Sequence, residues 1–193
     1  MVADAKLTPL LAGYVEWLRA QGHAATADEC AAMGQLSPLG LEQVLDGPVG
    51  ETNVYLLHPR GRVGAIAETE TGALIQIGAI LATGNIAVVE AGSIFGKVPA
   101  ALRTALGGHL DVVPNLDAEK DLRAVLFEGA RDKLMAFNQR IAARPGAIIV
   151  VQARTAEELA GGKSYNLPLL LEERSVSTNT AAAGGNASLM SIG

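Results

Sequence analysis

Apolar residues recur along the first part of the chain at the spacing of an amphipathic helix. Within residues 7–20, four large side chains fall on one helical face, namely Leu11, Tyr14, Val15 and Leu18. A second short helix is predicted over residues 27–33, and connectors rich in proline and glycine follow it. We therefore expect residues 1–52 to form N-terminal helices and a connector.

From residue 53 the apolar positions change to strand-like patterns. Residues 53–59 alternate between polar and apolar side chains. Continuous apolar runs, typical of parallel strands covered on both faces, then occupy residues 62–68, 85–91, 109–115, 124–130 and 147–153. Helical segments separate several of these runs, at residues 71–84, 98–108 and 131–146. This alternation predicts an α/β fold, with a Rossmann-like, doubly wound parallel sheet over residues 53–153.

Residues 154–193 break the alternation of strands and helices. A short helix is expected at residues 155–160, and residues 167–180 have the pattern of an extended strand or hairpin arm. The residues that follow are small, polar and rich in glycine, a composition typical of a disordered tail. The C-terminal segment is therefore predicted to be an arm with a tail.

The charge of the chain argues against a nucleic-acid partner, because the net charge is -5 and the 15 basic residues are scattered. Residues 72–89 are almost uncharged, but Gln76 and a turn signal at residues 83–85 interrupt them. A buried helix and strand explain this stretch better than a membrane span. A single cysteine and the lack of an apolar signal segment after Met1 favour a reducing, cytoplasmic location.

A Rossmann-like core raises the question of nucleotide binding. The phosphate groups of a dinucleotide need a glycine-rich turn at a helix N-terminus, whereas residues 68–72 read Glu-Thr-Glu-Thr-Gly and would repel them. Glu90 follows the second core strand, where a carboxylate could hold a ribose hydroxyl or could simply be solvated at the strand end. The missing glycine turn favours the second interpretation.

Other catalytic or metal-binding chemistry has little support in the sequence. Cys30 is the only thiol, and its neighbours Asp28 and Glu29 would raise its pKa, which indicates a structural cysteine. The three histidines, at positions 23, 58 and 109, are far apart and have no ligand at helical spacing. We therefore expect neither a metal site nor a thiol nucleophile.

Several motifs carry a resemblance to known families. LATGNIAVVEAGS and AVLFEGARDKLMAFNQRIA resemble strands and helices of the nucleotide-binding domain of aldehyde dehydrogenases. GPVGETNVYLLHPRGRV, together with ERSVSTNTAAAGGNASLM, resembles the C-terminal region of bacterial proline utilization A proteins. The resemblance extends over essentially the whole chain.

The resemblance to proline utilization A implies a division of labour. Long members of that family join a proline dehydrogenase and a glutamate-semialdehyde dehydrogenase, with FAD and NAD as cofactors, to a third domain that resembles an aldehyde dehydrogenase. That third domain has a Rossmann-like core and an oligomerisation β-flap, and its closing motif covers the tunnel between the two active sites. Carried over to this chain, it implies N-terminal helices at 1–52, a core at 53–153, and a β-flap with a tail motif at 154–193.

The same resemblance implies that the cofactor site is vestigial. Glu90 stands where the family has a cofactor lysine, and Glu128 stands where a small polar residue precedes the glycine of the turn. We expect no cofactor at these positions, which are Glu90, Phe127, Glu128 and Gly129. Only 40 residues follow Ala153, too few for a catalytic domain, so we expect no catalytic residue. The rival interpretation is a minimal NAD-dependent dehydrogenase or dehydrogenase fragment acting on glutamate semialdehyde.

The arm and the tail supply the expected interaction residues. Partners implied are the other domains of the longer enzyme and a second copy of the chain, which would form a homodimer through the arm. The residues expected to associate or to cover the tunnel lie in the last 25 positions, namely Leu169, Leu171, Arg174, Val176, Thr178, Asn179, Thr180, Gly184, Gly185, Asn186, Ser188, Leu189 and Met190.

Overall fold

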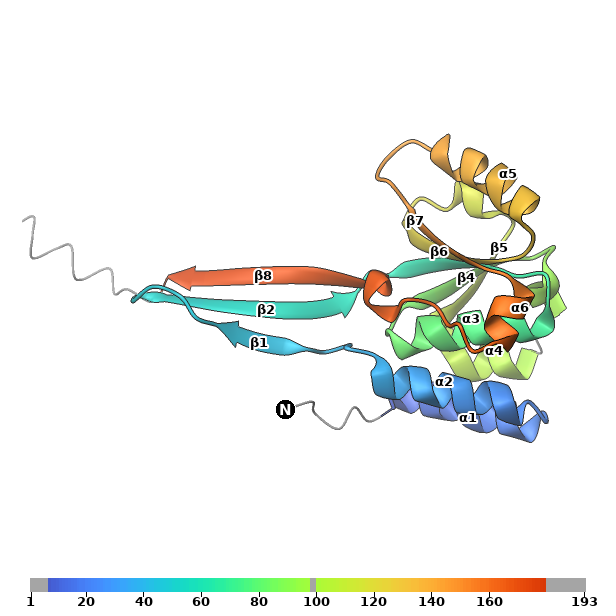
Figure 1. The fold of residues 1–193 in the computed structure, drawn as a ribbon, viewed down its shortest axis with the longest axis horizontal. Helices are drawn as coiled ribbons and strands as arrows, with labels where there is room; N and C mark the ends of the chain where they lie inside the picture. The colour runs from blue at the N-terminus through green and yellow to red at the C-terminus, as the bar shows by residue number, and fades with distance from the viewer. Residues whose placement is uncertain (1–6, 98–99, 180–193) are drawn as a thin grey trace, which may run out of the picture.

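The computed structural model describes residues 7–97 and 100–179, and in these residues the chain forms a layered core from which a long arm projects (Figure 1). The core holds a parallel sheet with helices on both faces, and the arm is an antiparallel sheet. An α/β fold with a Rossmann-like sheet, N-terminal helices and a C-terminal arm is therefore confirmed.

The parallel sheet has five strands in the order β5-β4-β3-β6-β7. They are β3 (Arg62–Ile66), β4 (Ile86–Glu90), β5 (Leu110–Val113), β6 (Leu122–Glu128) and β7 (Val150–Arg154). Each matches one of the apolar runs of the sequence. The chain runs outward from β3 to β5, and then returns to place β6 on the other side of β3. The carboxyl ends of β3 and β6 therefore form the point at which the strand order reverses, where doubly wound sheets bind their ligands.

Helices cover the two faces of this sheet because successive strand residues point to opposite sides. Val63, Ala65 and Leu126 share a buried cluster with α3 (Glu70–Ala82) and α4 (Ala100–Leu106). Val125 and Phe127 belong to a second cluster with α5 (Arg131–Ala142) on the opposite face. Figure 1 shows α5 alone above the sheet and α3 and α4 below it. α3 is enclosed on nearly all sides, and its buried residues are apolar except for Gln76.

Two N-terminal helices, α1 (Pro9–Ala20) and α2 (Ala24–Leu36), form a further layer outside α3 (Figure 1). The four residues predicted to face inward from the first helix are the four that α1 buries. The second helix is longer than the predicted segment 27–33. A β-carbon on Gly78 of α3 would collide with the sulfur of Cys30, so the glycine allows α2 and α3 to approach closely.

The arm consists of β1 (Glu42–Leu45), β2 (Glu51–Pro59) and β8 (Leu171–Asn179), with β2 in the centre. Residues 53–59 thus form the expected strand, but our expectation that they belong to the Rossmann-like core was wrong. They pair with β8 in antiparallel register, for example Val54 with Val176. Local alternation indicated an extended strand but did not specify its distant partner.

Shorter elements complete the chain between these strands. They are η1 (Ile94–Lys97), η2 (Gly107–His109), η3 (Leu116–Ala118), α6 (Ala156–Ala160) and η4 (Leu167–Leu170). A capping box formed by Thr155 and Glu158 begins α6. No helix within the described residues is both long and apolar enough to cross a membrane, and residues 72–89 form the expected buried helix and strand.

Candidate functional site

The reversal point between β3 and β6 opens into a cavity of about 330 Å³. Its walls come from the carboxyl ends of three strands and from one side of α5, namely Ile66, Glu68, Glu90, Phe127, Lys133, Ala136, Phe137 and Arg140. This is the position at which a doubly wound fold would hold a nucleotide. We call it the reversal-point crevice.

Glu128, the last residue of β6, fills the anion-binding position beside this crevice. Its side chain is only 1% exposed, and Oε2 accepts hydrogen bonds from the backbone amides of Glu68 and Thr69, each at 2.9 Å. The hydroxyl of Thr69 also donates to Oε2, at 3.2 Å. Exposed amides at a helix N-terminus normally attract phosphate. Here the amides that lead into α3 already bind a carboxylate of the same chain.

Gly72 makes this arrangement possible, because its missing side chain leaves room for the carboxylate. A β-carbon on Gly72 would lie 2.5 Å from Oε2 of Glu128. The amide of Gly72 donates instead to Oγ1 of Thr69, at 3.0 Å, which caps α3. The glycine of the loop at residues 68–72 therefore accommodates an internal anion rather than an external one.

Glu68, just after β3, extends in the opposite sense, toward α5. Its carboxylate forms an ion pair with Lys133, and a β-carbon on Gly129 would lie 2.9 Å from its Cδ. Each glutamate thus lies against the turn that follows the other strand. Glu128 of β6 binds amides just after β3, and Glu68, just after β3, lies against Gly129, just after β6. We call Glu68 and Glu128 the crossed glutamates.

Glu90 and two aromatic rings form the rest of the crevice. Oε1 of Glu90 accepts the amide of Leu116 at 2.9 Å and lies 3.4 Å from the guanidinium of Arg140. Arg140 also lies over the ring of Phe137, 5.2 Å from its centroid, and Phe137 stacks on Phe127 at 5.6 Å. The lysine that the aldehyde dehydrogenase resemblance requires is replaced by an acidic group with partners of its own.

The structure brings together, at one edge of the sheet, the four positions that were expected to be vestigial and to hold no cofactor. Glu90 and Phe127 line the crevice, and Glu128 and Gly129 form the turn beside it. Lys133, Phe137 and Arg140 were not predicted from the sequence as residues of a site. Their spacing of four and three residues places them on one side of α5, which is the signal that could have identified them.

A buried polar chain lies directly beneath the crevice. Gln76, in the middle of α3, donates to the carbonyl of Ile66 at 2.8 Å and to the hydroxyl of Tyr165 at 2.9 Å. Tyr165 in turn donates to the carbonyl of Phe127, at 3.2 Å. Burial raises the pKa of Tyr165, so the phenol stays protonated and keeps the ends of β3 and β6 joined.

Cys30 is buried, and its surroundings do not favour a role as a nucleophile. Burial raises the pKa of its thiol to about 12, and the charge of Glu29 adds to this effect. The thiolate required for attack is therefore scarce at neutral pH. Among residues 7–97 and 100–179, no group of three or more His, Cys, Asp or Glu side chains could hold a metal ion.

The apolar run before β8 belongs mainly to the core of this chain. Leu167 and Leu170 are buried, and Leu171 is 2% exposed, so this chain itself covers the side chain of Leu171. Leu169 and Val176 remain accessible, at 42% and 47%. The run is covered because η4 folds back onto the core before β8 leaves it.

The outer part of β8 carries the remaining expected association residues. Arg174 and Thr178 are exposed and Asn179 ends the strand. Arg174 lies 4.0 Å from Glu172. The other expected residues lie outside the described part of the chain, namely Thr180, Gly184, Gly185, Asn186, Ser188, Leu189 and Met190.

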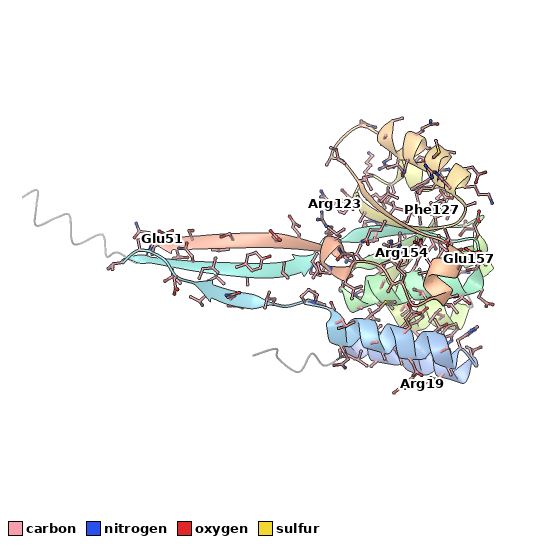
Figure 2. The ribbon with its side chains drawn as sticks, viewed as in Figure 1. Arg19, Glu51, Arg123, Phe127, Arg154 and Glu157 are labelled. Carbon is pink, nitrogen blue, oxygen red and sulfur yellow. The ribbon has the colours of Figure 1, made fainter. Side chains whose placement is uncertain are left out.

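A row of three valines crosses one face of the arm. Val44 pairs with Val54 in β1 and β2, and Val54 pairs with Val176 in β2 and β8. Opposite residues of an antiparallel pair point to the same face, so the three side chains are neighbours. Val44 is 69% exposed, which makes the row accessible. In Figure 2, Glu51 marks the far end of the arm, well away from Phe127 in the core.

Comparisons with known proteins identify relatives over most of this chain. It is 40% identical over 186 residues to the bifunctional protein PutA of Rhizobium meliloti, covering 96% of this chain and 15% of that protein. It is 39% identical over 166 residues to the bifunctional protein PutA of Escherichia coli K12, covering 85% of this chain and 12% of that protein. The chain thus spans about one seventh of the length of these relatives. No family model matches it.

Solved structures show the same fold. A bifunctional proline utilization A (PutA) protein superposes with a TM-score of 0.60 at 24% identity, over 76% of this chain and 19% of that one. An indole-3-acetaldehyde dehydrogenase superposes with a TM-score of 0.57 at 17% identity, over 79% of this chain and 45% of that one. Sequence identity over most of its length and the shared fold together show that this chain is related to a domain-sized part of the PutA proteins and has a Rossmann-like fold that aldehyde dehydrogenases share.

Proposed function

We propose that this chain is a non-catalytic structural and interaction domain of a bifunctional proline-catabolic enzyme of the PutA type. Its core is a rigid scaffold, its arm associates with another polypeptide, and its tail covers the tunnel through which the intermediate passes. The observation that carries this proposal is that Glu128 occupies the backbone amides beside the reversal-point crevice, while Glu68 lies on the crevice wall and pairs with Lys133.

The crossed glutamates support the absence of dehydrogenase chemistry. The amides that would bind a pyrophosphate bind Glu128, and a phosphate arriving there would meet its negative charge at close range. The lysine position is occupied by Glu90, which adds a second carboxylate to the cavity wall. A dinucleotide would therefore have to displace internal hydrogen bonds and overcome repulsion between like charges.

The shape and surface of the arm support a role in association. A three-stranded sheet with few covering elements has little core of its own, and the row Val44, Val54 and Val176 is an apolar surface suited to a partner. We propose that other domains of the PutA-type enzyme cover this row, and that a second copy covers it when the chain is isolated, which gives a homodimer.

Sedimentation equilibrium tests the proposed association through the arm. The chain should be dimeric at tens of micromolar, and Val44→Lys with Val176→Lys should shift it to monomer by placing two charges in the contact. Met135→Lys is the control, because Met135 is exposed on α5, outside the arm. A monomeric wild-type chain, or an unchanged dimer in the double variant, would contradict association through this face.

The alternative is an NAD-dependent aldehyde dehydrogenase fragment, with glutamate semialdehyde as its substrate. The specific observation in its favour is the cavity of about 330 Å³ at the position where this fold binds nucleotides. Calorimetric unfolding with NAD distinguishes the two functions. A site filled to 100 times its dissociation constant would stabilise the chain by about 2.7 kcal/mol. We expect no such stabilisation.

A further inference from the structure

All three strands of the arm are attached to the core at one tight turn, and we call the point where each strand joins the core its root. This turn joins α3 to β4 and consists of Thr83, Gly84 and Asn85. Elements that are separated along the sequence reach it from three directions: the connector before β1, the link from β2 to β3, and the end of η4 before β8. We call this turn the arm socket.

Asn85 holds two of the three roots through its side chain. Its Oδ1 accepts the backbone amide of Gly61, at 2.8 Å, in the link between β2 and β3. Its Nδ2 donates to the carbonyl of Leu170, at 2.9 Å, immediately before β8. Asn85 is fully buried, so both bonds are shielded from water.

The rest of the socket fixes Asn85 and receives the third root. Nδ2 of Asn85 also donates to the hydroxyl of Thr83 at 2.8 Å, and that hydroxyl lies 3.0 Å from the carbonyls of Ala79 and Ile80. Gly84 has a φ of +69°, and a β-carbon there would lie 3.1 Å from both Leu39 and Pro59. The glycine therefore lets the connector before β1 and the end of β2 rest directly on the turn.

The core itself does not require an amide side chain at this position. The parallel pairing of β3 and β4 is made by backbone groups, from Arg62 with Ile86 to Ala65 with Val89. The side-chain bonds of Asn85 instead reach Gly61 and Leu170, the two points where the chain enters or leaves the arm. The Asn85 amide accepts through Oδ1 and donates both hydrogens of Nδ2, whereas an ionised carboxylate has no hydrogen to donate and a hydroxyl has only one.

We infer that Asn85 is a positioning residue that sets the direction in which the arm leaves the core, and thereby the geometry in which the arm meets its partner. The second part rests on the proposed function of the arm; the first does not. Loss of the Asn85 side chain leaves the strands of the arm paired with one another but frees their common base to pivot.

The distance between the arm and the core measures this role directly. Spin labels are placed at Val49→Cys, at the exposed turn between β1 and β2, and at Gln139→Cys on the exposed side of α5. Cys30 is buried, so it should not take up label. Dilution with excess unlabelled chain restricts the pulsed dipolar signal to one molecule, so the result does not depend on whether the chain dimerises.

Asn85→Ala should broaden the distance distribution and speed hydrogen exchange at Gly61 and at the first residues of β8. Tyr14→Phe is the matched control, because it removes another buried hydrogen bond, from Tyr14 to the carbonyl of Leu74 at 2.9 Å, in a layer away from the arm. The control should keep the wild-type distribution. A distribution in Asn85→Ala as narrow as that of the control would overturn the inference.

Leu39→Ala serves as a milder variant if Asn85→Ala does not fold. It removes the side chain that rests on Gly84 and leaves the core strands unchanged. It should broaden the same distribution to a smaller degree, and an unchanged width would overturn the inference on its own. Sedimentation of the wild-type chain tests the proposed association separately. Failure of the association therefore does not decide the role of Asn85, and failure of that role does not decide the association.

Discussion

A β-carbon added to Gly72 would lie 2.5 Å from Oε2 of Glu128, closer than real β-carbons approach a neighbouring atom. The two residues come from different strand–helix units, α3 and β6, and meet at the reversal point of the sheet. The glycine and the glutamate are therefore one feature: the first provides the space, and the second occupies the position that a bound anion would take.

Their dependence can be measured with a double-mutant cycle. Gly72→Ala should destabilise the wild-type chain, because the new methyl group displaces Glu128 from buried amides, at a cost of about 1–3 kcal/mol. In a Glu128→Ala background the same change should cost much less, since only the close contact with Oγ1 of Thr69, at 2.9 Å, remains and alanine is the better helix former. Urea unfolding of the four proteins gives the coupling energy. Additive effects would show that the two residues act independently.

Dinucleotide binding should be restored only by changes at the crevice. Wild-type chain should show no shift in Tm with NAD, whereas Glu90→Lys with Glu128→Thr should show a small positive shift, because both changes remove negative charge from the wall and rim. Glu16→Lys with Glu157→Thr is the control, since it makes the same charge change on exposed helices. A wild-type shift equal to that of the crevice variant would support the dehydrogenase alternative.

The buried thiol should make stability depend on pH in alkali. The pKa of Cys30 is about 12 in the folded chain, whereas an ordinary cysteine, as in the unfolded chain, has a pKa of 9.0. Between these two pH values the unfolded chain loses a proton that the folded chain keeps. Stability is then fully present below pH 9 and falls as the pH rises, by about 1.4 kcal/mol per unit for one group. At pH 10, wild type should have lost about 1.4 kcal/mol more than Cys30→Ala.

Urea unfolding at pH 8 and pH 10 checks this expectation, with Cys30→Ala as its internal reference. Burial, and after it the charge of Cys30, raises the pKa of Tyr14; this tyrosine is present in both proteins, so the larger of the two effects is common to them. The native thiol should also react slowly with a disulfide reagent at pH 8 and rapidly in urea. Equal pH slopes in the two proteins, or fast reaction of the native chain, would count against a buried, protonated cysteine.

The tail motif, residues 181–193, lies outside the described residues, and its tunnel-covering role stays a prediction. Deleting it from a full-length PutA-type enzyme should introduce a lag in the coupled conversion of proline to glutamate. Proline oxidation measured alone should change much less, because that step does not use the tunnel. Paired progress curves of intact and truncated enzymes give the answer, and two lag-free coupled curves would remove the role.

Local sequence patterns determined the helices and strands of the core and their buried faces. The four inward residues of α1 and the five parallel strands follow from the spacing of apolar side chains, which is a property of neighbouring residues alone. The acidic character of Glu90 and Glu128 could also be read without a structure. Repulsion of a phosphate was the natural prediction from them, since only their charge was visible.

Tertiary structure decided which distant segments meet. The strand at residues 53–59 joined the arm because β8 supplied its partner from the far end of the chain, and period-two alternation is the same in either sheet. Leu171 became buried because η4 folds back on the core. Glu128 became a ligand of the amides before α3, and Asn85 the anchor of the arm, because the fold places Thr69 and Leu170 within hydrogen-bond reach. Such contacts depend on how the whole chain packs, and no local periodicity encodes them.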